Sequence, residues 1–174
     1  SQPLVCSPSG CAIPALGIAA RIELAFHIRQ PSPREPCQYQ IGLRFTEGVI
    51  DNPALPVPLR NLSGEVYLDG SQIVLHSLRA ASGDSRLFLE GRLSRDPAAP
   101  ARRFTLQARN LEFGREIQQL LWGNLLTLYE SLRPAGRFNI DLAAATDGRS
   151  AWQIHLNQFE VFDCSLLPQA FPYP

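Results

Sequence analysis

Four cysteines and three histidines are the residue types in this chain best suited to metal or redox chemistry, but their spacing does not assemble a site. The cysteines are Cys6, Cys11, Cys37 and Cys164, and the histidines are His27, His76 and His155. No Cys-x-x-Cys pair occurs, and the histidines lie far apart in the sequence, so the ligand spacing of a zinc site is absent. We therefore predict no metal and no cofactor.

The cysteines have a second possible role, in disulfides. Four cysteines allow three complete pairings, among which sequence cannot choose. A local Cys6–Cys11 disulfide would staple the Pro-bearing N-terminal stretch, whereas Cys37 and Cys164 are expected to be buried free thiols. Such a disulfide favours an oxidising compartment.

No arrangement typical of catalysis is present. The chain contains no Gly-x-Ser-x-Gly, Gly-x-Gly-x-x-Gly or His-Glu-x-x-His sequence. Asp69, Asp84 and Asp96 fall in predicted turns, where aspartate bonds to nearby backbone amides. Glu90 and Arg92 lie two residues apart on the polar side of a strand, with Arg86, and are expected to form cross-strand surface pairs. We predict that the chain is not an enzyme.

The charged residues exclude further classes of function. There are 16 basic and 16 acidic residues, and every basic one is arginine. The balance gives no basic patch of the kind that nucleic acid requires. The absence of lysine excludes Schiff-base chemistry and a P-loop. No apolar run reaches the roughly 18 residues of a membrane-spanning helix.

Most of the chain shows the period-two alternation of half-buried β-strands. In residues 18–29, for example, Ile22, Leu24 and Phe26 share one face, and Glu23 and His27 share the other. The expected strands cover about residues 18–29, 37–46, 62–69, 73–80, 87–93, 104–108, 137–144 and 152–162. Leu156 and Phe159 are out of step with each other, which predicts a β-bulge in the last strand.

One segment has helical spacing instead. Between Arg115 and Leu132 the leucines recur every three or four residues, and Pro134 and Gly136 follow. The predicted fold is therefore mainly β (α+β): an antiparallel curved sheet or half-barrel of amphipathic strands, with one covering helix near 115–132.

An internal repeat organises the strands. Leu55-Pro-Val-Pro58 returns as Phe171-Pro-Tyr-Pro174, and three more pairs of similar segments follow the same order at offsets of about 112 to 116 residues. One such pair is Val49-Ile-Asp51 and Val161-Phe-Asp163. We expect an N-terminal arm over 1–17 and a single β-rich domain over 18–174. That domain would comprise the end of one repeat (18–58), a full repeat (59–163) and the start of the next (164–174), within a longer chain.

A segment rich in Gly and Leu runs from Leu59-Arg-Asn-Leu-Ser-Gly64-Glu-Val-Tyr-Leu-Asp-Gly70 to Leu93, and the leucine-rich helix and a Gly-led strand at Gly136 follow it. This arrangement resembles the repeating unit of the AsmA-like, TamB-related bacterial envelope proteins. The resemblance implies a non-enzymatic segment on the periplasmic side of the inner membrane, within a larger membrane-anchored protein of stacked β repeats. It also implies lipid transport or outer-membrane biogenesis through a concave apolar groove. Expected partners are phospholipid and neighbouring repeats of the same chain, with membrane contact made by parts outside this segment.

Groove-lining candidates are the residues on the apolar strand faces. They are Leu62, Val66, Leu68, Leu87, Leu89, Leu93, Phe104, Leu106, Phe138, Ile140 and Leu142. One-sided alternation is also what a closed β-sandwich shows. The alternative is therefore a closed sandwich that acts as a structural or protein-interaction module with no lipid role.

Overall fold

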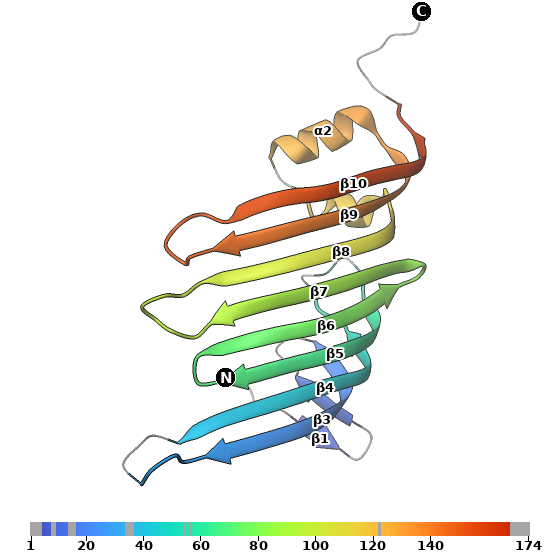
Figure 1. The fold of residues 1–174 in the computed structure, drawn as a ribbon. Helices are drawn as coiled ribbons and strands as arrows, with labels where there is room; N and C mark the ends of the chain where they lie inside the picture. Colours follow the sequence, from blue (N-terminus) through green and yellow to red (C-terminus); the bar gives the residue numbers. More distant parts are fainter. Residues whose placement is uncertain are drawn as a thin grey trace, which may run out of the picture.

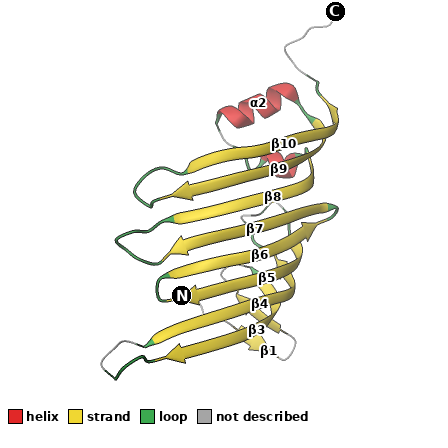
Figure 2. Ribbon diagram, viewed as in Figure 1, coloured by secondary structure: helices red, strands yellow, loops and turns green. Residues whose placement is uncertain are grey.

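The strands form one open antiparallel sheet, in which each strand pairs with its neighbours in sequence order (Figures 1 and 2). The computed structural model describes residues 5–7, 10–13, 17–33, 37–53, 55, 57–121 and 123–167. The strands are β1 (Val5–Ser7), β2 (Gly10–Ile13), β3 (Ile18–Arg29), β4 (Gln38–Ile50), β5 (Leu59–Asp69), β6 (Gln72–Ser82), β7 (Ser85–Ser94), β8 (Arg102–Glu112), β9 (Ala135–Thr146) and β10 (Gln153–Ser165). The predicted mainly β, antiparallel class is confirmed. The described strands make a single sheet, not the two stacked sheets of a sandwich.

Short turns built on aspartate connect several of the strands. The Asp69 carboxylate accepts hydrogen bonds from the backbone amides of Ser71 and Gln72, at 2.7 and 2.8 Å. The Ser71 hydroxyl donates to the same carboxylate, and these bonds, led by that hydroxyl, hold the pKa of Asp69 below its usual value. Asp147 closes the β9–β10 turn in the same way. Asp69 is thus a turn former, as predicted.

A row of β-bulges crosses the sheet near one end of the strands. Residues with positive φ are Glu47 in β4, Asn61 and Gly64 in β5, Ser77 in β6, Asn110 in β8, Gly136 in β9 and Asp163 in β10. Register shifts accompany most of them. All lie toward the end where β3 begins and β4 finishes. Because a bulge bends its strand and increases its twist, the strands turn at this end, on the right of Figure 1.

The small core lies beside this row. Among the described residues the buried hydrophobic ones are Ala20, Phe45, Leu62, Ala80, Ala81, Ala108 and Phe138. Each lies within a few residues of a bulge or a register shift. No large side chain in the described part of the chain is completely buried. The long arms of the strands therefore form a single layer, and close packing is confined to the bulged end.

The same backbone contact occurs in the β3–β4 and β9–β10 hairpins. Gly17 and Gly136 both have positive φ, at 64° and 118°. A Cβ at Gly17 would meet the carbonyl oxygen of Asp51, and one at Gly136 would meet that of Asp163. Only glycine allows such a close backbone approach. Asp51 and Asp163 are equivalent in the sequence repeat, whose boundaries stay a prediction.

The N-terminal arm differs from expectation. Residues 5–7 and 10–13 pair as a hairpin, and β2 continues onto the start of β3 through Ile13 and Ile18. No strand was predicted in this arm, because two strands of three and four residues are too short to show an alternating pattern.

The predicted helix over 115–132 is also wrong as a single element. It is divided into α1 (Arg115–Gln118) and α2 (Asn124–Leu132). α1 ends at Gln118, and α2 begins only after Gly123, whose φ of 56° is incompatible with a right-handed helix. Neither helix has a buried residue, and Leu125 and Leu128 of α2 are exposed. These helices lie at the β8–β9 connection and do not cover the sheet.

Candidate functional site

The register places all eleven groove candidates on one face of the sheet. Residues directly opposite in an antiparallel pair project to the same side. Val66 is opposite Leu75, and Leu78 beyond the bulge in β6 is opposite Leu89. Leu89 is opposite Leu106, and Leu106 is opposite Leu142. The same links join Leu68 to Leu93 through Ile73, Leu87 to Ile140 through Ala108, and Phe138 to Leu111. We call this side the apolar face.

The apolar face is open to different degrees along its length. Leu62 and Phe138 are buried at the bulged end, and the other nine candidates are half-buried. No described element forms a second layer over them. Their partial burial comes from neighbouring side chains in the same sheet, so the face is neither a closed core nor fully solvated.

Two outer strands extend the apolar face beyond the predicted candidates. The exposed residues on them are Leu24, Phe26 and Ile28 of β3, and Ile154, Leu156, Phe159 and Val161 of β10. Register joins them to the same side, as Leu24 to Leu43 and Leu156 to Leu142 show. Their alternation was visible in the sequence. Leaving them out of the candidate list underestimated the width of the face.

Aromatic rings gather at the bulged end of this face. Phe138 lies between Phe113, with ring centroids 4.5 Å apart, and Phe159 at 5.5 Å. Tyr129 of α2 approaches Phe113 at 6.3 Å, and its hydroxyl donates to the Gly114 carbonyl at 3.1 Å. Partial burial raises the pKa of Tyr129. Through these contacts α2 is held beside the bulged end of the sheet.

The opposite side, which we call the polar face, carries a charged network on β3, β4 and β5. Arg44 bonds to Glu65 Oε1 through Nε at 2.9 Å and Nη2 at 2.8 Å, and lies 3.5 Å from Glu23. The Tyr67 hydroxyl donates to Glu65 Oε2. The hydrogen bond from Tyr67 is the main cause that lowers the pKa of Glu65, and the hydrogen bond from Arg44 is the next. The same contacts raise the pKa of Tyr67 and the pKa of Arg44. The network is exposed and stabilises the surface without forming a reactive centre.

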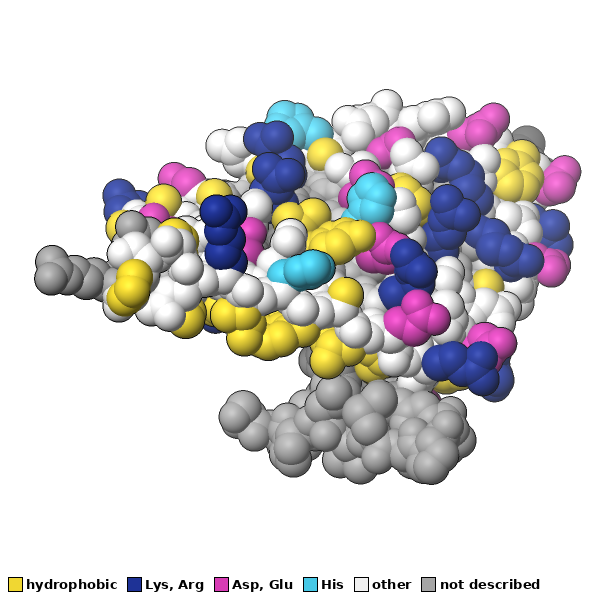
Figure 3. All heavy atoms as spheres, turned by 60° about the horizontal axis from the view of Figure 1, so that its bottom comes forward, with side chains coloured by type: hydrophobic (Ala, Val, Ile, Leu, Met, Phe, Trp, Pro, Cys, Tyr) yellow, Lys and Arg dark blue, Asp and Glu magenta, His cyan; other side chains and the backbone are white. Residues whose placement is uncertain are grey.

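The three histidines also lie on the polar face, each on a different strand. His27 is opposite Gln40, His76 is opposite Glu65, and His155 is opposite Ala143. Figure 3 shows histidine, arginine and carboxylate side chains together on one face. Within the described ranges, no three His, Cys, Asp or Glu side chains lie close enough to hold a metal ion.

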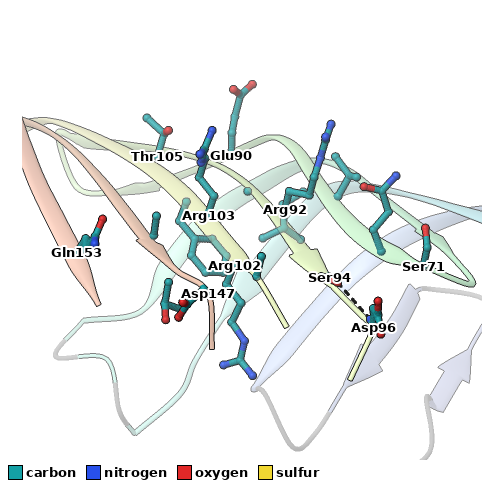
Figure 4. Close-up of a pocket in the computed structure, with 18 of the residues that line it drawn as sticks. Ser71, Glu90, Arg92, Ser94, Asp96, Arg102, Arg103, Thr105, Asp147 and Gln153 are labelled. Carbon is teal, nitrogen blue, oxygen red and sulfur yellow. Dashed lines mark hydrogen bonds between the residues drawn. The ribbon is translucent and has the colours of Figure 1, made fainter. Parts of the chain in front are cut away.

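An open depression of about 1110 Å³ lies at the hairpin ends of β6 to β10. Glu90, Arg92 and Arg103 rise from one side of the sheet there, and Arg102 is directed to the other (Figure 4). Arg92 is directly opposite Arg103, and Glu90 is opposite Thr105. The predicted cross-strand surface pairs of Glu90 and Arg92 do not form as salt bridges among the described residues. The hydroxyl of Ser150 donates to Asp147 Oδ2 at 3.2 Å at the edge of the hollow, as part of the β9–β10 turn.

The cysteines divide into two pairs. Cys6 and Cys11 are direct partners in the β1–β2 ladder, a register that suits a cross-strand disulfide; their side chains lie outside the described structure, so the disulfide stays a prediction. Cys37 and Cys164 are free, as expected, but both are exposed, not buried. Each lies at or beyond the end of a strand, where nothing packs over its side chain.

Comparison with known proteins finds no matching family model, no matching curated protein and no matching solved structure. In the described part of the chain, no helix is both long and apolar enough to cross a membrane.

Proposed function

We propose that this chain is a non-enzymatic segment of a periplasmic envelope protein and that its apolar face holds the acyl chains of phospholipid. The observation that carries the proposal is the single-layer sheet: eight long strands present one contiguous apolar side with no described layer packed on it. Exposed apolar areas of this extent mark interaction surfaces, because water contact with them is unfavourable.

The chemistry of the face suits hydrocarbon. No polar or charged residue is buried in the described structure, and the residues opposite one another on the apolar face from β3 to β10 are mostly aliphatic or aromatic. A ligand that needs hydrogen bonds would find few there, whereas an acyl chain needs none.

The dimensions of the face also suit lipid. Strands about 4.8 Å apart make a face of eight strands roughly 34 Å wide. One lipid tail spans about half of a bilayer's hydrocarbon core, or about 15 Å. The face is therefore wide enough for more than one tail, and the bulged end would limit how far a tail extends along the strands.

The resemblance to AsmA-like proteins supports the cellular setting of the proposal. On this basis the segment lies on the periplasmic side of a bacterial inner membrane, in a larger anchored chain, between neighbouring repeats. It would take part in lipid transport or outer-membrane biogenesis.

Native mass spectrometry of the purified chain, followed by solvent extraction and lipid analysis, tests the proposal. We expect phospholipid in a fixed ratio, lost when a charge is placed at the centre of the face in Leu89→Asp or Leu106→Asp. The matched control is Thr105→Asp, one residue from Leu106 on the polar face. Circular dichroism checks that all three variants fold.

A folded wild-type chain that carries no lipid would contradict the proposal and would favour a protein-interaction module. Equal lipid loss in Thr105→Asp would show that a charge on either side disturbs the sheet, and that the apolar face is not the specific site.

A further inference from the structure

An arginine marks the hairpin end of the apolar face. Leu93 is directly opposite Arg102, and Arg102 is directly opposite Thr146, so these three side chains project to the same side of the sheet. Figure 4 shows Arg102 directed away from Arg92 and Arg103, which rise from the polar face. Arg102 is exposed and borders the open depression at this end. A positive charge therefore lies where the hydrocarbon surface meets water.

The guanidinium of Arg102 has no hydrogen-bond or ion-pair partner in the described part of the chain. The nearby polar groups are already engaged. Asp96 and Asp147, in the adjoining turns, accept hydrogen bonds from the backbone amides of those turns. Arg95 donates to the Tyr39 hydroxyl at 2.6 Å. The planar fork of N–H donors on Arg102 is therefore available to a ligand from solution.

We propose that Arg102 binds the phosphate of a phospholipid whose acyl chains lie on the apolar face. The lipid is then held with its headgroup at the hairpin end and its tails toward the bulged end. This inference rests on the proposed function and adds the headgroup site and the orientation to it. A guanidinium suits phosphate because it can donate two parallel hydrogen bonds to two oxygens of one group. A phospholipid should therefore bind better than a neutral lipid with the same tails.

The length of the apolar face along β8 matches a lipid held in this way. After Arg102, the residues of β8 on this side are Phe104, Leu106 and then Ala108, which is buried in the core. A strand rises about 3.3 Å per residue, so Arg102 and Ala108 are about 20 Å apart along β8. An acyl tail takes about 15 Å of this length, which leaves about 5 Å for the glycerol next to the phosphate. Because the described core contains no polar or charged residue, only the tail suits that end.

Aromatic side chains at the hairpin end suit the boundary between headgroup and tail. Trp152 lies against Phe104, with ring centroids 5.9 Å apart, and is 46% exposed. Tyr39 lies on the apolar face of β4, near its hairpin end. Tryptophan and tyrosine are favoured where an apolar surface meets water, because each has an apolar ring and a polar N–H or O–H. They place the polar–apolar boundary near the level of Arg102.

A comparison of two lipids with identical tails tests the headgroup site. The chain, freed of lipid by detergent exchange, is offered dioleoylphosphatidylglycerol or dioleoylglycerol in the same micelles, and native mass spectrometry quantifies the bound lipid. We expect a preference for phosphatidylglycerol that Arg102→Gln lowers about tenfold, the typical effect of losing a hydrogen bond to a charged group. The matched control is Arg103→Gln, which changes the same residue type at the adjacent position on the polar face and should keep the preference.

Photo-crosslinking tests the orientation. A phosphatidylglycerol that carries a diazirine at the end of one acyl chain should label the bulged end of the sheet, around Leu111 and Phe138. Labelling concentrated in the hairpin residues 94–101 would place the tail where the headgroup is expected and would overturn the proposal.

The outcomes separate this inference from the proposed function. A folded chain that binds neither lipid would overturn both. Equal binding of the two lipids, or a preference that Arg102→Gln leaves unchanged or that Arg103→Gln lowers equally, would overturn only the headgroup site. In those cases Leu89→Asp should still abolish binding of both lipids, as the proposed function requires. Arg102 is exposed, so Arg102→Gln should fold as the wild type does, which circular dichroism checks.

Discussion

Replacing Phe138 by alanine removes the least exposed large side chain of the sheet, at 5% exposure, from between the rings of Phe113 and Phe159. Truncation of a buried phenylalanine to alanine lowers the free energy of unfolding by about 3–5 kcal/mol. We expect the lower end, about 3 kcal/mol, because the cluster lies at the edge of a thin core. Against a total of about 5–15 kcal/mol, that is a large loss.

The matched control is Phe26→Ala. Phe26 is the same residue type on the same face, but it is 54% exposed and lies on an outer strand. Since full burial of such a side chain contributes about 1.5–3 kcal/mol, loss of half that burial should lower the free energy of unfolding by about 1 kcal/mol.

Urea denaturation followed by circular dichroism measures both changes. With a denaturant dependence of about 2 kcal/mol per molar urea, the midpoint should fall by about 1.5 M for Phe138→Ala and by about 0.5 M for Phe26→Ala. Equal shifts would refute the reasoning. They would mean that the apolar face is packed as tightly on β3 as at the bulges, and so is covered in solution.

Two further outcomes follow from the backbone and the surface network. Gly136→Ala should lower the free energy of unfolding by about 2 kcal/mol or more, since alanine is strained at the φ of 118° and its Cβ would meet the Asp163 carbonyl. Thermal denaturation measures this change, and Gly70→Ala is the control because there is open space around Gly70, so its melting temperature should change little. Equal effects of the two substitutions would contradict the close contact at Gly136. Because the fold lowers the pKa of Glu65, this residue stabilises the folded state at pH values above the ordinary pKa of a glutamate. The contribution is lost as the pH falls through the lowered pKa. Tyr67→Phe removes the main cause, so an NMR titration should show the pKa of Glu65 rising; an unchanged pKa would show that the hydroxyl does not matter.

The strand pattern was predictable because alternation is a local property of the sequence. Ile22, Leu24 and Phe26 share a face in the sequence and in the ladder with β4. The mismatch of Leu156 and Phe159 likewise predicted a bulge, which the structure places at Asn157.

Other features were not readable from local pattern. Glu47, Ser77 and Asn110 adopt positive φ, although none is the glycine that usually marks such a position. Their conformations follow from how adjacent strands bend together. Helical spacing continues through Gly123 in the sequence because leucines recur on both sides of it, but in the structure α1 ends at Gln118 and α2 begins at Asn124.

Whether the apolar face is covered could not follow from the sequence either. A half-exposed strand such as β7, with Leu87, Leu89 and Leu93 on one side, has the same alternation in a sandwich and in a single layer. The distinction lies in the presence of a second layer, which is a property of the whole chain.

The strict sequence order of the strands has a consequence for how the molecule folds. Every strand from β2 to β9 pairs only with the strand before it and the strand after it. Most pairings close a short loop, the exception being β8 with β9, whose connection contains both helices, so the entropy lost at each step does not increase as the sheet lengthens. The sheet can therefore form hairpin by hairpin while the chain is being synthesised. Each completed strand is the template for the next.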